Sequence, residues 1–338
     1  MLKNKAVNLV KAFIVPVAIY LIVLLLTFGR VGNLDSIISM LTLAVVPTVI
    51  AYGVHFGFIS GIMDFSVGSR MTLAAIIGCI CGYFFGPVGM IVGTVAASLV
   101  LAAIIGGLFA ILKIPSFVIS LGSLMVFEVM GERLTKYCAE VLPDLANYQY
   151  LKAPSSMLFL GKAPYNFIFL FVIAIGFEMV NTRTKIANQA RVVGSDELIA
   201  RNVGIDPMKV KFGTFILGSV FLALAAVVST CYASVAGYVA SMGSMATVFK
   251  PMMAVIIGMS LGRIVRSCVG IFIGNLCLSV IFTGIIALGW PDNLQNIFLG
   301  LFLVGVLGMP TIQRTIADIK RRRAAKKAHE NAPAPSKV

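Results

Sequence analysis

The chain has 338 residues, of which 59% are hydrophobic and 12% charged, and its mean hydropathy is +1.00. This charged share is about half that of an average soluble domain, so the sequence predicts a protein of the lipid bilayer and excludes an ordinary soluble one. The formal charge of +14 could suggest nucleic-acid binding, but the basic residues lie between apolar runs and at the two ends of the chain, so no nucleic-acid partner is expected.

Apolar runs long enough to cross a bilayer recur along the whole sequence. A spanning helix needs about 20 apolar residues. The runs at 71–85 and 251–262 fall short of that length and are expected to be tilted, broken or re-entrant. The sequence therefore predicts an all-α membrane protein with about ten transmembrane helices, at 12–29, 38–59, 71–85, 88–112, 116–134, 165–181, 213–234, 251–262, 268–288 and 295–312.

The distribution of charge predicts the orientation of these spans. If the lysine-bearing N-terminus is cytoplasmic and ten spans follow, most of the 27 Lys and Arg fall inside, with Arg70 among the inner and Lys250 among the outer residues. This agrees with the positive-inside rule. We expect both termini in the cytoplasm, a transmembrane domain over 1–312 and a basic cytoplasmic tail over 313–338 that is attracted to anionic lipid.

Small residues within the spans indicate close helix packing. Gly78, Gly82 and Gly86 recur at intervals of four before a turn at Gly86-Pro87, and such spacing lets helix backbones approach each other in lipid. The cysteines have neither zinc-site spacing nor the loop placement of a disulfide framework. They are expected to be small core residues: Cys79, Cys81, Cys138, Cys231, Cys268 and Cys277.

One carboxylate stands in an almost wholly apolar stretch, at the expected inner boundary between the second and third spans. Asp64 lies within residues 58–69, FISGIMDFSVGS. Its side chain can cap the N–H groups of the next helix, at Ser66 or Val67. The surrounding small residues permit a tight reversal and satisfy backbone groups that lipid cannot: Gly61, Ser66, Gly68 and Ser69. A functional role at the cytoplasmic mouth is the alternative interpretation.

A second carboxylate falls deep in the fifth expected span. Glu128 lies well inside the apolar run 116–134, where a charge costs on the order of 3 kcal/mol. It should therefore face a cavity or a partner, and both a translocation path and a pairing inside the bundle remain open. Candidates for lining a path on this span are Ser120, Ser123, Phe127 and Glu128.

The expected inner loop at 182–212 contains a short helix with clear boundary signals. Ser195 is a suitable N-cap, and the carboxylates of Asp196 and Glu197 suit the positive end of a helix. Gly204 offers the left-handed residue that closes a helix. Asp206 then caps a second helix with Pro207 at its first position.

This short helix carries apolar side chains on a loop that faces water. Leu198, Ile199 and Val203 are apolar, so some face of the helix is expected to be buried. It either packs on the cytoplasmic helix ends of its own chain or contacts a cytoplasmic partner.

The sequence lacks the parts of an enzyme or a motor. The only Gly-Lys pair, Gly161-Lys162, has no phosphate-loop spacing, so any ATP is hydrolysed by another chain. The two histidines, His55 and His329, lie at opposite ends of the sequence, and no cluster has metal spacing. His55 is expected to be a hydrogen-bonded packing residue, and Glu178 to be in contact with water at the end of its span.

Three segments resemble the permease subunits of bacterial ribose, galactose and xylose ABC importers. Residues 61–69, GIMDFSVGS, are similar to the G-G-I-D-L-S-V-G-S signature of that family. Residues 115–122, PSFVISLG, resemble its P-x-F-I-x-T-L-G segment, and residues 193–205, VGSDELIARNVGI, resemble its L-G-G-N-E-x-A-A-R-L-S-G-I loop. Order and spacing agree over residues 40–310.

The resemblance implies a permease of the bacterial inner membrane that holds no cofactor. It implies three protein partners: a second permease copy or a related chain, a cytoplasmic ABC ATPase that uses the ATP, and an extracytoplasmic substrate-binding protein. The coupling helix inserted into the ATPase would then be formed by Ser195, Asp196, Glu197, Leu198, Arg201 and Gly204.

Departures from the family pattern leave the solute open. Ile62 replaces the second glycine of the signature, Phe65 replaces its leucine, and Glu128 stands where the family usually has arginine. A sugar or a similar small polar solute is expected, with a nucleoside as an alternative. Two other classes remain as alternatives: a self-sufficient carrier or channel that uses Glu128 and His55 for ions, and a membrane scaffold without a pathway.

Overall fold

The computed structural model describes residues 2–112, 114–291, 294–295, 297–301 and 304–305. The chain divides into two units, Met1–Pro291 and Asp292–Val338, and the first unit contains every element named below. The expected tail at 313–338 lies outside the described residues, as does most of the expected last span at 295–312.

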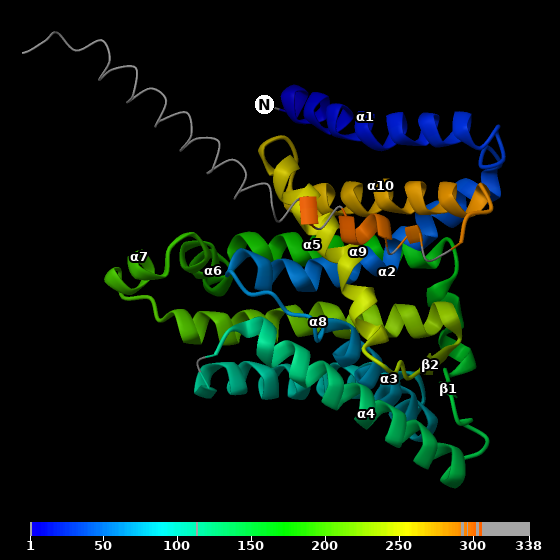
Figure 1. Cartoon of the computed structure of the whole chain (residues 1–338), viewed down its shortest axis with the longest axis vertical. Coiled ribbons are helices and arrows are strands. Elements are labelled where there is room, and N and C mark those ends of the chain that lie inside the picture. The colour runs from blue at the N-terminus through cyan, green and yellow to red at the C-terminus, as the bar shows by residue number, and fades with distance from the viewer. Residues whose placement is uncertain (1, 113, 292–293, 296, 302–303, 306–338) are drawn as a thin grey trace, which may run out of the picture. The chain divides into compact units, whose positions relative to one another are not determined.

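Helices dominate the described part of the chain (Figure 1). The long ones are α1 (Leu2–Leu26), α2 (Leu34–Ile59), α3 (Val67–Leu112), α4 (Ser116–Val141), α5 (Tyr165–Arg183), α8 (Pro207–Ala233), α9 (Ala246–Ser260) and α10 (Ser267–Ala287). The shorter elements are α6 (Lys185–Ser195), α7 (Glu197–Asn202), three 3-10 turns, η1 (Ser155–Gly161), η2 (Gly243–Met245) and η3 (Leu261–Arg263), and two strands, β1 (Tyr150–Lys152) and β2 (Val235–Gly237).

Seven helices in the described part of the chain are long and apolar enough to cross a membrane. They are α1, α2, α3, α5, α8, α9 together with η2, and α10. In this set α3 counts once although Gly86 divides it, and α4 is left out because its second half is charged. With α3 divided and α4 included, the described helices account for nine of the ten expected spans. The expectation of an all-α membrane protein is confirmed, with one small β ribbon added.

The expected turn at Gly86-Pro87 divides α3 into two antiparallel helices. Gly86 has φ 68° and ψ −160°, a conformation that only glycine adopts readily. The two halves then pack face to face, so that a Cβ on Gly78 would overlap the Thr94 side chain. The small residues predicted to permit close packing do so within this hairpin.

The two ends of the described bundle differ in structure (Figure 1). The N-terminal end of α1 and the α6–α7 segment lie toward one end. The antiparallel β1–β2 ribbon, in which Leu151 pairs with Ala236, lies toward the other. This arrangement agrees with the expectation that the N-terminus and the 182–212 loop share one side of the membrane.

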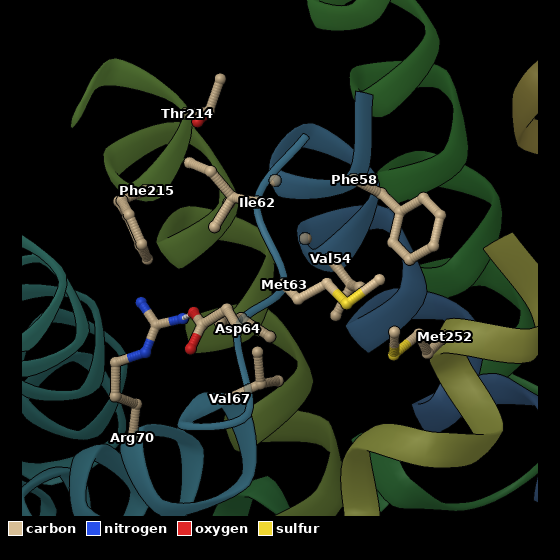
Figure 2. Close-up of a pocket in the computed structure, with 14 residues that line it drawn as sticks. Val54, Phe58, Ile62, Met63, Asp64, Val67, Arg70, Thr214, Phe215 and Met252 are labelled. Carbon is tan, nitrogen blue, oxygen red and sulfur yellow. Dashed lines mark hydrogen bonds and ion pairs between the residues drawn. The ribbon is translucent and has the colours of Figure 1, made fainter. Parts of the chain in front are cut away.

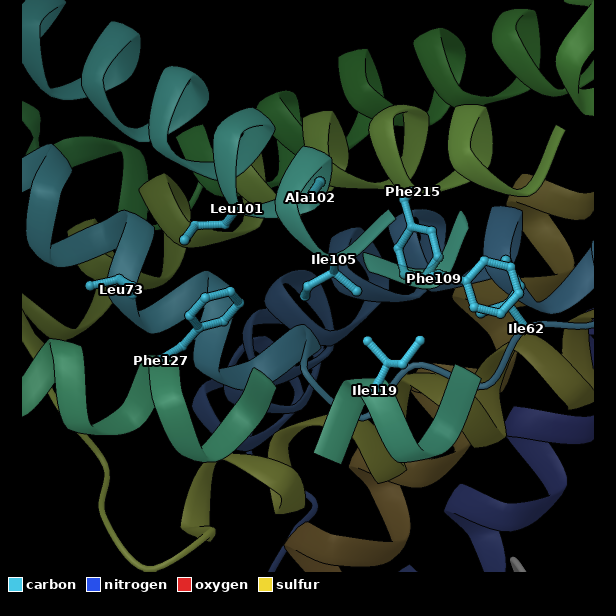
Figure 3. Packing of buried hydrophobic residues seen from close by; sticks show 9 residues of the cluster. All are labelled: Ile62, Leu73, Leu101, Ala102, Ile105, Phe109, Ile119, Phe127 and Phe215. Carbon is cyan, nitrogen blue, oxygen red and sulfur yellow. The ribbon is translucent and has the colours of Figure 1, made fainter. Parts of the chain in front are cut away.

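The core of the bundle is built around α8, which packs against both α2 and α3. Where α2 and α8 cross, a Cβ on either Gly53 or Gly218 would lie 2.7 Å from the carbonyl oxygen of the other. A cluster of buried side chains joins α3, α4 and α8 to the turn between α2 and α3 (Figure 3). Its members are Ile62, Leu73, Leu101, Ala102, Ile105, Phe109, Ile119, Phe127 and Phe215.

Two cations that the charge distribution places in loops lie within helices. Arg70 is in the first turns of α3 and is buried. Lys250 is in α9, where its ammonium donates to Ser279 Oγ at 2.9 Å and lies over the Phe282 ring. Both long side chains find polar or aromatic partners inside the bundle, so neither acts as a loop charge.

Candidate functional site

Asp64 caps the turn between α2 and α3, as the sequence predicts. Gly61 adopts φ 78° just after α2 ends, which allows the chain to reverse. The Asp64 carboxylate then accepts hydrogen bonds from the backbone N–H of Ser66 at 2.9 Å and from its hydroxyl at 2.6 Å. The predicted capping at Ser66 is confirmed, and Val67 begins the helix.

The same carboxylate forms an ion pair with Arg70, which the sequence interpretation missed. The other Asp64 oxygen accepts from Arg70 Nη2, and both side chains are almost inaccessible to solvent. Breaking a buried pair leaves an uncompensated charge and costs far more than losing a surface pair. Asp64 therefore supports both the turn and the charge of Arg70.

A small cavity lies beside this pair, between α2, α3 and α8 (Figure 2). Its volume is about 20 Å³, and its walls include Phe58, Met63 and Thr214. Pockets that bind small molecules have volumes of roughly 300 Å³ or more, whereas about 10–15 Å³ is enough for one water molecule. In this conformation the cavity can hold water but not a sugar.

The rest of the signature segment is held by its own hydrogen bonds and by close contact with η2. The Ser69 hydroxyl donates to the Ser66 carbonyl at 2.9 Å, which satisfies a buried polar group. Gly68 faces the Ser244 carbonyl so closely that a Cβ at residue 68 would overlap it. Glycine is required here by close backbone approach.

Glu128 on α4 binds the chain around η2, where Ser244 lies. Its carboxylate accepts hydrogen bonds from the backbone N–H of Met242 at 2.8 Å and of Ser244 at 3.0 Å, and from the Ser244 hydroxyl at 2.5 Å. These bonds offset the cost of a charge at membrane depth, on the order of 3 kcal/mol. Of the two roles left open for Glu128, the structure shows pairing inside the bundle.

The other candidate pathway residues on α4 are also buried. Ser120 donates its hydroxyl to the Phe117 carbonyl at 2.9 Å, and Ser123 is buried on the same helix. Phe127 belongs to the apolar cluster of Figure 3. That Ser120, Ser123, Phe127 and Glu128 line a solute path stays a prediction.

The loop at 182–212 contains two short helices, α6 and α7, where the sequence predicted one. The first, α6, continues to Ser195, whose hydroxyl donates to the Val192 carbonyl. The predicted N-cap at Ser195 is therefore wrong by one residue. Asp196 caps α7 by accepting from the N–H groups of Leu198 at 2.7 Å and Ile199 at 3.2 Å. Aspartate and serine are equally good N-caps. Because Ser195 is the last residue of α6, Asp196 is the residue that caps α7.

The predicted end of α7 and the start of α8 are confirmed. Gly204 has φ 78°, the left-handed conformation that follows a helix C-terminus. Asp206 accepts from the N–H groups of Met208 and Lys209, and Pro207 is the first residue of α8. The ion pair between Glu197 and Lys211 ties α7 to α8.

Three apolar side chains of α7 and its C-cap are exposed. Leu198 is 71% exposed, Ile199 57% and Val203 64%. Within α7 only Ala200 is buried, against Ala190, Val193 and Val210. The alternative in which these side chains pack on their own helix ends is therefore wrong in this subunit, and they form an exposed apolar face.

Helix α6 connects α7 to the transmembrane helices. Arg191 Nη2 donates to the backbone oxygen of Asn181 on α5 at 2.8 Å and to its side-chain oxygen at 2.6 Å. The same Asn181 oxygen lies 3.3 Å from His55 Nε2 on α2. A Cβ on Gly194 would overlap the Ile59 carbonyl at the end of α2. His55 is a hydrogen-bonded packing residue, as expected.

Comparison with known proteins identifies the family. Residues 36–307 match the family described as the branched-chain amino acid transport system / permease component. The autoinducer 2 import system permease protein LsrC of Klebsiella pneumoniae is 26% identical over 310 residues, which cover 91% of this chain and 86% of the relative. The xylose transport system permease protein XylH of Escherichia coli K12 is 23% identical over 362 residues, which cover 89% of this chain and 91% of the relative.

A third relative is the inner membrane ABC transporter permease protein YjfF of Escherichia coli K12. It is 24% identical over 282 residues, which cover 78% of this chain and 81% of the relative. A solved structure is similar in fold: the inward-facing conformation of a transporter assigned to the metal-chelate type of ABC transporters. It has a TM-score of 0.50 at 12% identity and covers 88% of this chain and 98% of its own.

Family membership decides several of the expectations from sequence. Permeases of this family are multi-pass inner-membrane subunits of ABC importers; they are not enzymes and bind no cofactor, and a separate subunit supplies the ATPase. The family match covers most of the chain and includes both the Asp64 turn and the α6–α7 segment. The chain belongs to the branched-chain amino acid transport system / permease component family of ABC importer permeases.

Proposed function

We propose that this permease carries a sugar or a similarly small polar solute into the cell, driven by a cytoplasmic ATPase that docks on α7. Two of its relatives are named for the import of xylose and of autoinducer 2, which supports this solute class. An extracytoplasmic binding protein delivers the solute, and a second permease copy or a related chain completes the membrane part. A nucleoside is the alternative cargo.

The exposed apolar face of α7 is the observation that carries the docking proposal. Leu198, Ile199 and Val203 project from a capped, ion-paired helix at the end of the bundle that also holds the N-terminal end of α1 (Figure 1). An exposed apolar patch on a water-facing loop is typical of a protein contact. The face is preformed, so docking requires little ordering of the loop.

The contacts of α6 supply a route for transmitting force. A displacement of α7 moves α6, because Ala200 packs against Ala190 and Val193. Displacement of α6 then acts on α2 through the contact of Gly194 with Ile59. The Asp64 turn follows Ile59 directly, so we propose that the turn moves with α2 during the transport cycle.

The ion-coupled carrier has less support. The two groups that it would use, Glu128 and His55, are both engaged in hydrogen bonds inside the subunit. Residues that carry ions across a bilayer usually face a water-filled cavity. The bonded state of both groups favours a structural role in the bundle.

Altering the charge on the α7 face should weaken ATPase binding without unfolding the permease. Leu198→Asp and Arg201→Glu are each compared with the unaltered chain in pull-down of the partner ABC ATPase, and in stimulation of its ATP hydrolysis. Tyr148→Asp serves as the control, because Tyr148 is also exposed but lies beside the β1–β2 ribbon at the opposite end.

We expect each of the two α7 variants to bind the ATPase at least about tenfold more weakly than the unaltered chain. A loss of this size is typical when one or two buried residues are removed from an interface. The Tyr148 variant should bind normally. Undiminished binding by both α7 variants, in monodisperse protein, would refute docking at α7.

A further inference from the structure

An apolar crevice of about 440 Å³ opens on the side of the helix bundle, between α1, α5 and α10. Its floor includes Tyr52 and Leu170, which are buried, and its wall on α5 includes Phe171 and Ile175, which are exposed. Its volume falls in the range of ligand-binding pockets. Because the chain is a membrane protein, the solvent at this surface is lipid.

The crevice has the length of one leaflet. Its lining on α5 extends from Phe167 to Glu178, a rise of about 16 Å at ~1.5 Å per residue. Half of a hydrocarbon core of ~30 Å is about 15 Å. The lining begins at the third residue of α5 and ends at Glu178, five residues before the C-terminus of the helix. A single acyl chain can therefore lie along α5 with its headgroup at the Glu178 end.

Two residues of opposite charge line the crevice. Arg266 precedes the first residue of α10, and Glu178 lies one turn before the end of α5. Glu178 accepts a hydrogen bond of 3.4 Å from the Cys268 backbone N–H. Neither charged side chain forms an ion pair within the described ranges of the chain.

We propose that this crevice binds a phospholipid whose zwitterionic headgroup carries a primary ammonium group. The acyl chain occupies the apolar crevice, Arg266 donates to the phosphate, and Glu178 accepts from the ammonium. An anionic headgroup without an ammonium would be attracted by Arg266 but would meet the carboxylate of Glu178. A quaternary ammonium has no N–H to donate to that carboxylate.

Native mass spectrometry of the purified full-length chain tests the proposal with three lipids of matched acyl chains. They are phosphatidylethanolamine, phosphatidylglycerol and phosphatidylcholine. The unaltered chain should retain phosphatidylethanolamine severalfold better than the other two. Equal retention of all three lipids, or a preference for phosphatidylglycerol, would overturn the proposal.

Variants of the two charged lining residues, Arg266 and Glu178, test whether the retained lipid is bound in this crevice. Arg266→Gln should lower retention of phosphatidylethanolamine about tenfold, as expected for the loss of one charge-assisted hydrogen bond. Glu178→Gln should remove the preference for phosphatidylethanolamine over phosphatidylglycerol. Matched controls outside the crevice, Arg201→Gln and Asp144→Asn, should leave retention unchanged; both side chains are exposed.

A steric variant separates crevice binding from general surface binding. Ala174 lines the crevice, so Ala174→Phe should fill it and lower retention of the lipid while the protein stays monodisperse in size-exclusion chromatography. Unchanged retention in this variant would refute the site, as would the absence of retained lipid in the unaltered chain. The outcome does not depend on which solute the permease carries.

Discussion

At the scale of single residues, Asp64 combines two roles that the sequence suggested only in part. Its capping of Ser66 follows from local chemistry, because aspartate before a helix start is a common cap. Its pairing with Arg70 does not follow from any local rule, since positions six apart in a chain meet only when a turn brings them together. An asparagine at this position would keep the cap but lose the ion pair.

We therefore expect Asp64→Asn to destabilise the fold by about 3–5 kcal/mol, because Arg70 would be left as an uncompensated buried charge. Thermal unfolding of the purified chain in detergent measures the loss. In the double variant, Asp64→Asn with Arg70→Met, no unpaired charge is left at this turn, and much of the stability should return. A single variant as stable as the unaltered chain would contradict the buried pair.

Residue-level prediction succeeded where a side chain acts on its nearest backbone neighbours. The roles of Gly204 and Asp206 follow from turn and cap chemistry within three residues. The partners of Glu128 could not be predicted, because Met242 and Ser244 follow it by more than one hundred residues. The cost of burying a charge predicted only that Glu128 needs some partner.

At the scale of helices, the hairpin of α3 was predictable and the crossing of α2 with α8 was not. The Gly86-Pro87 turn and the glycines around it are regular features of one segment. Gly53 and Gly218 are isolated glycines in distant helices, and nothing in either segment marks them as a pair. Helix α6 was missed because its polar sequence was assigned to a loop, although Thr184 caps it.

The crossing of α2 and α8 gives a prediction with an internal control. Gly53→Ala would place a Cβ 2.7 Å from the Gly218 carbonyl oxygen, so the two helix backbones must separate. We expect a loss of about 1–3 kcal/mol, typical of overpacking, measured as a lower thermal midpoint. Gly176→Ala on α5 meets no atom within 4 Å and should be neutral or gain up to about 1 kcal/mol from helix propensity. Equal midpoints for the two variants would refute the close contact.

At the scale of the whole molecule, composition and charge predicted the class of the protein and most of its spans. Hydropathy detects spanning helices because lipid cannot form hydrogen bonds with the backbone, so an apolar segment must form them internally. The short span expected at 251–262 corresponds to the short helix α9. The solute could not be predicted. A path for a small polar solute is lined by residue types that also serve in packing, and the cavity at Asp64 is too small to bind a sugar.

ATPase docking requires α7 to face the cytoplasm. A cysteine scan with a membrane-impermeant maleimide tests this directly in cells that express the chain. Val203→Cys marks the α7 face and Tyr148→Cys marks the opposite end, since both native side chains are largely exposed. The unaltered chain gives the background, because its six cysteines are free and lie within helices α3, α4, α8 and α10.

We predict that in intact spheroplasts the maleimide labels Tyr148→Cys and leaves Val203→Cys unlabelled, and that Val203→Cys reacts once the membrane is opened. Labelling of Val203→Cys from the outside of intact spheroplasts would place α7 away from any ATPase and contradict the proposed mechanism.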